Sequence, residues 1–135
     1  MNMRPVFGKN GSALLLVVFV VALLSAVVMG MLQVITGDVQ VMRNQVFAAE
    51  AQEIAEAGLH DELYRIRKNW QWVSGVTENF NGGSYTVTVA GSKPNLTVES
   101  TGTSAQGFVC RVQADLVVGD STYPYPIKVD KFRVN

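Results

Sequence analysis

The spacing of hydrophobic positions changes twice along the chain. Residues 13–35 form an almost continuous apolar run in which 20 of 23 side chains are apolar. From Phe47 to Trp70 the apolar positions recur every three or four residues, and after Trp72 they alternate with polar ones. These three patterns predict, in order, an apolar helix, an amphipathic helix and a set of β-strands.

The apolar run is long enough to cross a bilayer. No charged residue lies between Lys9 and Asp38, and about 20 helical residues cover the roughly 30 Å of a hydrocarbon core. We therefore expect a transmembrane helix over residues 12–36. Arg4 and Lys9 precede it without an acidic residue, which predicts a cytoplasmic N-terminus and an extracytoplasmic remainder. A secretory signal peptide is the alternative, but its apolar region usually spans only about 7–15 residues.

Residues 37–69 have the pattern of an amphipathic helix that continues the transmembrane one. The stretch from Asp38 to Lys68 has no proline and is rich in good helix formers. We expect its apolar stripe to pack on the strands that follow, through Leu59, Leu63, Ile66 and Trp70. The charged side chains are expected to fill the opposite, solvated side: Glu50, Glu53, Glu56, Asp61, Glu62, Arg65 and Arg67.

Residues 70–135 are expected to form a β-sheet domain. Alternation predicts four strands, and turn signals such as Asn81-Gly82-Gly83 separate them. The expected strands are 85–89, 96–99, 108–118 and 127–134, the last with a bulge near Lys131. We predict an α+β fold in which a four-stranded antiparallel sheet packs on the end of the helix. The expected buried aromatic residues are Trp70, Trp72, Tyr85 and Phe108.

Composition excludes several classes of function. Eleven basic and eleven acidic residues give a net charge of zero, so nothing indicates a nucleic-acid partner. With one histidine and one cysteine, the sequence does not support a Ser/His/Asp or Cys/His catalytic arrangement. We expect neither enzymatic activity nor a cofactor. Glu53, Glu56 and His60 could share a helix face, but a solvated face explains them better than a metal site. Cys110 is expected to be a buried hydrophobe, with no disulfide partner in the chain.

A ridge of small residues marks one face of the apolar run. Ala22, Ala26 and Gly30 recur at a spacing of four, which lets transmembrane helices approach one another closely. We expect this ridge to contact other helices. Ordinary membrane-helix composition is the competing explanation, since alanine is common in any span.

Three segments follow one another along the first half of the chain: Gly11-Ser12-Ala13-Leu14-Leu15-Leu16-Val17, then Arg43-Asn44-Gln45, then Ile54-Ala55-Glu56-Ala57-Gly58-Leu59. In these segments the chain resembles type IV pilin-like proteins, and in particular the PilX N-terminal family of minor pilins. The resemblance covers about residues 8–63. The sheet half resembles minor pilins in pattern only.

The resemblance implies a processing step at the start of the apolar run. Residues 1–11 would be a basic leader that a prepilin peptidase removes by cutting between Gly11 and Ser12. The same enzyme would then methylate the new amine of Ser12. A juxtamembrane linker glycine is the alternative interpretation of Gly11.

The resemblance also implies an assembly role. Major pilins carry a glutamate as the fifth mature residue, where this chain has Leu16; minor pilins and the K-type minor pseudopilins of type II secretion share that departure. We therefore expect a bacterial inner-membrane subunit that initiates a pilus at or near its tip. Its implied partners are the prepilin peptidase, other major and minor pilins, and the assembly platform of a pilus or secretion system. A secretion pseudopilin and a non-polymerising, single-pass binding protein remain alternatives.

Overall fold

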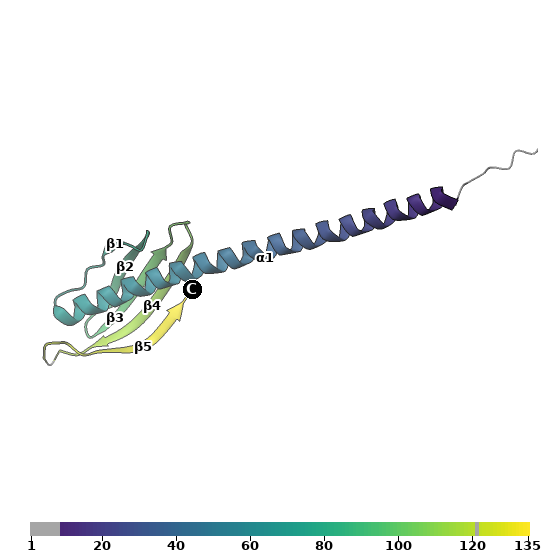
Figure 1. The fold of residues 1–135 in the computed structure, drawn as a ribbon. Helices are drawn as coiled ribbons and strands as arrows, with labels where there is room; N and C mark the ends of the chain where they lie inside the picture. Colours follow the sequence, from purple (N-terminus) through teal and green to yellow (C-terminus); the bar gives the residue numbers. More distant parts are fainter. Residues whose placement is uncertain (1–8, 121) are drawn as a thin grey trace, which may run out of the picture. The chain divides into compact units, whose positions relative to one another are not determined.

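The computed structural model describes residues 9–120 and 122–135. One α-helix, α1 (Lys9–Lys68), precedes five strands, β1 (Thr77–Phe80), β2 (Gly83–Ser92), β3 (Asn95–Thr103), β4 (Val109–Val118) and β5 (Ile127–Val134) (Figure 1). The chain divides into two compact units, Met1–Met42 and Arg43–Asn135, with the boundary inside α1. Most of the expected leader, residues 1–8, lies outside the described residues.

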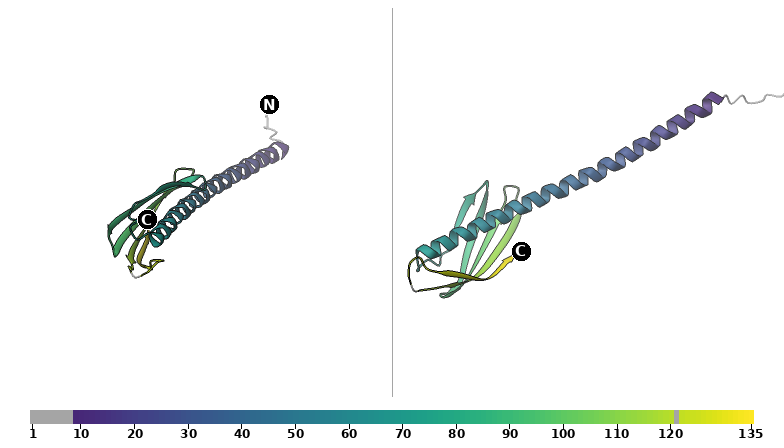
Figure 2. Two further views of the ribbon diagram at one scale, coloured as in Figure 1. Left: turned by 90° about the vertical axis from the view of Figure 1, so that its left-hand side faces the viewer. Right: turned by 60° about the horizontal axis from the view of Figure 1, so that its bottom comes forward.

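The strands form one antiparallel meander in the order β1-β2-β3-β4-β5. Figure 2 shows the last turns of α1 lying across one face of this sheet. The pairing of β4 with β5 shifts register so that Asp115 opposes Lys131 while Leu116 opposes Val129. Asp130 is therefore the extra residue of a bulge, next to the predicted position. The α+β fold with a long N-terminal helix is confirmed.

The expected number of strands was wrong, because β1 was missed. This strand has only four residues, all exposed, and its glutamate and asparagine have low strand propensity. A signal was nevertheless present at Asn81-Gly82, whose positive φ angles of 50° and 80° make the tight turn that joins β1 to β2. Such a turn requires a strand on both sides, so it predicts β1 as well as β2.

The core lies between the end of α1 and the inner face of β2, β3 and β4. Its helical side chains are Ile54, Ala55, Leu59 and Ile66, and its strand side chains include Val87, Leu96, Val98, Val112, Ala114, Leu116 and Val118. The predicted helical stripe is thus largely correct, with Leu63 and Trp70 half-buried at its margin. Among the expected aromatic residues Tyr85 is buried, whereas Trp70, Trp72 and Phe108 are half-buried.

Glu62 does not face solvent as expected. Its side chain is 0% exposed, on the buried stripe between Gly58 and Ile66. The indole of Trp72 donates a 2.7 Å hydrogen bond to Glu62 Oε1, while Oε2 has no partner among the described residues. Burial raises the pKa of this carboxyl group, and the Trp72 hydrogen bond offsets part of that effect.

Candidate assembly surfaces

The first half of α1 is apolar and exposed. Every side chain from residue 11 to residue 46 is exposed in the described chain, including Leu14, Phe19 and Leu24 at 68%, 65% and 60%. The helix is long and apolar enough to cross a membrane. Soluble proteins rarely leave so large a contiguous apolar surface in water. None of the described residues covers this surface, which leaves it open to lipid or to another molecule.

The predicted processing and packing positions all lie on this exposed segment. Gly11 and Ser12 are exposed residues inside α1, and no atom lies within 4 Å of a side chain built on Gly11. Ala22, Ala26 and Gly30 are exposed as well, and the space around Gly30 is open. Neither group has a partner within the described part of the chain, so both are accessible to another molecule.

The segment Ala55-Glu56-Ala57-Gly58-Leu59 has a packing role in this structure. Ala55, Gly58 and Leu59 are buried, whereas Glu56 and Ala57 are half-buried. A Cβ atom added to Gly58 would lie 2.6 Å from Ser100 Oγ and 2.7 Å from the ring of Tyr85. Real Cβ atoms do not approach other heavy atoms so closely, so only glycine fits here.

The sheet contributes a matching glycine. A Cβ atom on Gly102 of β3 would lie 2.4 Å from the Ala51 carbonyl oxygen and 2.4 Å from the Ala55 nitrogen. Both contacts are to helix backbone, which cannot move aside as a flexible side chain can. Small residues on α1 and a glycine on β3 therefore bring helix and sheet close together.

A polar network closes the end of this core. Arg65 donates to Asp61 at 2.9 Å and to Glu78 at 2.6 Å, and so ties α1 to β1. The Tyr85 hydroxyl lies 3.2 Å from Asp61 Oδ2 and 3.3 Å from Glu78 Oε2. Burial and these two carboxylates raise the pKa of Tyr85 to about 12, so it stays protonated and donates.

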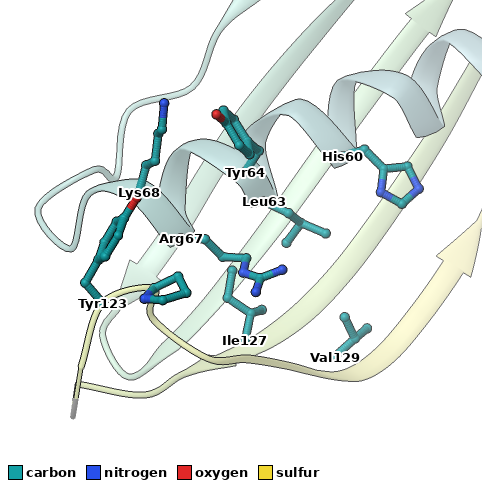
Figure 3. Close-up of a pocket in the computed structure, with 9 residues that line it drawn as sticks. His60, Leu63, Tyr64, Arg67, Lys68, Tyr123, Ile127 and Val129 are labelled. Carbon is teal, nitrogen blue, oxygen red and sulfur yellow. The ribbon is translucent and has the colours of Figure 1, made fainter.

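A groove lies between the end of α1 and β5. Its volume is about 470 Å³, and Figure 3 shows Leu63, Ile127 and Val129 pointing into it. Arg67 reaches into the same space. His60 lies on α1 at one end of the groove, and Lys68 lies at its rim. The sequence pattern does not indicate this groove, because the groove is created by the path of the loop before β5. A charged residue next to the apolar stripe, Arg67, is the signal that the sequence does contain.

The residues considered as metal ligands or as a reactive thiol form no metal or catalytic site among the described residues. Glu53 and His60 are exposed and Glu56 is half-buried, and no group of three possible ligands within the described ranges is placed to hold a metal ion. Cys110 is half-buried rather than fully buried, and its thiol donates to the Asn135 carbonyl oxygen at 3.6 Å. Burial raises the pKa of the Cys110 thiol, which disfavours the reactive thiolate.

No protein-family model, curated protein or solved structure matches this chain.

Proposed function

We propose that this chain is a minor subunit of a type IV pilus-like fibre, acting in pilus assembly or initiation at or near the tip. The observation that carries the proposal is the division of α1. Its first half is apolar and exposed in every described residue from 11 to 46, while its last turns are buried against a sheet. A membrane and then neighbouring helices are environments that such a helix can occupy in turn.

In this proposal the exposed start of α1 is processed before assembly. A prepilin peptidase cuts between Gly11 and Ser12, both of which lie on open helix surface, and methylates the Ser12 amine. Before that cut the N-terminus is cytoplasmic, because Arg4 and Lys9 precede the span, and the sheet domain is extracytoplasmic.

Leu16 favours a minor position over a position in the shaft. It stands where major pilins carry a glutamate, and its side chain is exposed and apolar. A carboxylate at this depth would need a cationic partner on a neighbouring subunit, since an unpaired charge in the membrane costs several kcal/mol. A subunit that lacks the carboxylate needs no such partner. That independence suits a subunit that starts a fibre.

Replacement of Gly11 tests the proposal. In cells that carry the assembly machinery, Gly11→Ala is expected to accumulate as an unprocessed precursor in the inner membrane and to lower the number of pili. Gly37→Ala is the matched control, because Gly37 is also an open position on α1, and it is expected to be processed normally. Normal processing and piliation of Gly11→Ala would reject the fibre proposal in favour of a single-pass protein that does not polymerise.

A further inference from the structure

The groove between α1 and β5 has fixed walls. The Tyr125 backbone nitrogen donates a 3.3 Å hydrogen bond to the Arg67 carbonyl oxygen, which attaches the loop before β5 to the end of the helix. The rings of Trp70 and Tyr125 pack at a centroid distance of 5.3 Å. A groove formed in advance binds with little ordering cost, because its walls need not rearrange.

The groove has a positive charge that no carboxylate among its described lining residues neutralises. Its cations are Arg67 and Lys68, and His60 lines it as well. The ion pairs within residues 9–120 and 122–135 involve Arg65, Arg111, Lys128 and Arg133.

Lys68 lies over the Tyr64 ring at 5.0 Å, which leaves Arg67 as the cation that reaches into the groove (Figure 3). A basic residue in the last turn of a helix also interacts favourably with the helix dipole. That effect does not require the side chain to enter a groove, and it does not explain the apolar floor beneath it.

The apolar floor continues along β5. Val129, Phe132 and Val134 are 48%, 52% and 42% exposed. Their partners on β4 are Leu116, Ala114 and Val112, all of them buried. Helix α1 thus covers the inner face of β4 but leaves that of β5 open, and the groove opens onto an apolar strip.

The chemistry of this surface matches a protein segment better than a free anion or a lipid. Arginine and tyrosine are enriched where proteins bind one another, and Arg67, Tyr64 and Tyr123 surround an aliphatic floor here. A free anion would leave that floor in water. The outer edge of β5 is guarded against strand addition by charged side chains and by the bulge at Asp130. The inner face is therefore the accessible part of this strand.

We propose that the groove and the inner face of β5 dock an acidic, apolar peptide segment of a partner protein. The Arg67 guanidinium binds a carboxylate of that segment through its planar pair of donors. Aliphatic side chains of the segment lie on Leu63, Ile127 and Val129. Every residue of the docking site belongs to the unit Arg43–Asn135, so the site includes no part of the apolar, exposed segment on which the fibre proposal rests.

A peptide probe tests this site on the full chain in phosphatidylcholine nanodiscs. The probe is a fluorescein-labelled, capped ten-residue peptide in which leucine alternates with aspartate, and its neutral counterpart has asparagine for aspartate. We expect saturable binding of the acidic peptide with a micromolar Kd. Arg67→Gln should weaken that binding at least about tenfold, since it removes a charge-assisted pair. Arg43→Gln, an exposed arginine elsewhere on α1, should leave it unchanged.

A second substitution changes the floor without changing Arg67. Val129→Glu puts a negative charge on an already exposed position, so it should weaken binding of the acidic peptide while the domain stays folded. Equal binding of the neutral peptide, or no loss in Arg67→Gln, would overturn the proposal. Binding of phosphatidylglycerol vesicles or inorganic phosphate that depends on Arg67, without binding of the peptide, would overturn it in favour of a lipid or a free anion.

Discussion

The two halves of α1 show opposite relations between hydrophobicity and burial. In residues 13–35, 20 of the 23 side chains are apolar, most of them are large, and all 23 residues are exposed. Over residues 51–66 the buried stripe combines the large apolar side chains of Ile54, Leu59 and Ile66 with Ala51, Ala55 and Gly58, which have little or no side chain. The second half fits a sheet supplied by its own chain, so small residues suit it. The first half has large apolar side chains that none of the described residues covers.

The largest expected effect is a loss of stability when a side chain is added where α1 and β3 lie in close contact. Gly102→Ala should destabilise the sheet domain by about 3 kcal/mol or more, because the new methyl group meets helix backbone at 2.4 Å. Denaturant unfolding of the full chain, followed by the fluorescence of Trp70 and Trp72, measures this loss. Gly37→Ala adds the same methyl group in open space and should leave the unfolding midpoint unchanged. Wild-type stability of Gly102→Ala would show that the close approach is not required.

A charge in the apolar half of α1 should impair membrane insertion without changing the stability of the sheet domain. Val21→Lys should oppose membrane insertion by about 3 kcal/mol, the cost of a lysine near the centre of a span, yet leave the sheet domain folded. Fractionation into membrane and soluble pools measures insertion. Val41→Lys, equally exposed but beyond residues 13–35, is the control and should insert normally. Full insertion of Val21→Lys would contradict the assignment of this segment to the bilayer.

Glu62 is a charged residue buried inside the packed half of α1. The pKa of Glu62 is raised in the folded protein, so the folded state holds this proton more tightly than the unfolded chain. The resulting stabilisation is complete below the ordinary glutamate pKa and is lost as the pH rises through the folded value. Glu62→Gln keeps the size and cannot ionise, so it should be more stable than the wild type by about 2 kcal/mol at neutral pH.

Unfolding measured across the acidic to neutral range checks this sign. The advantage of Glu62→Gln should disappear at low pH, where Glu62 itself is protonated. Glu53→Gln, on the exposed side of the same helix, should follow the wild-type curve throughout. Parallel curves for Glu62→Gln and the wild type would mean that Glu62 does not titrate in the core.

The smallest expected effect is at the ridge of small residues. Ala26→Leu should weaken association between transmembrane helices by about 1 kcal/mol or less, since it separates closely packed backbones. Energy transfer between labelled subunits in a membrane measures the association. Val27→Leu changes an adjacent face and is expected to have no effect. Equal association of both variants would reject Ala22, Ala26 and Gly30 as the contact.

The elements of this fold differ in how far the spacing of their apolar residues predicts them. Periodicity identified the helix, four of the strands and the bulge, because alternation and helical spacing report directly which side chains face a core. Glu62 was misassigned because of its residue type and not its spacing: it lies four residues from both Gly58 and Ile66 on the buried stripe, but a carboxylate is ordinarily solvated unless it has a buried partner such as Trp72. The groove beside Arg67 could not be predicted, because it depends on where the loop before β5 attaches to the helix end.

The most direct test of the account is the mass of the mature N-terminus. Intact-mass and peptide mass spectrometry of the protein from cells with a prepilin peptidase should identify a chain that begins at Ser12 with a methylated amine. That result would link the exposed half of α1 to fibre assembly. A mature population that retains Met1, or begins elsewhere, would contradict the proposal that this helix belongs to a processed pilin-like subunit.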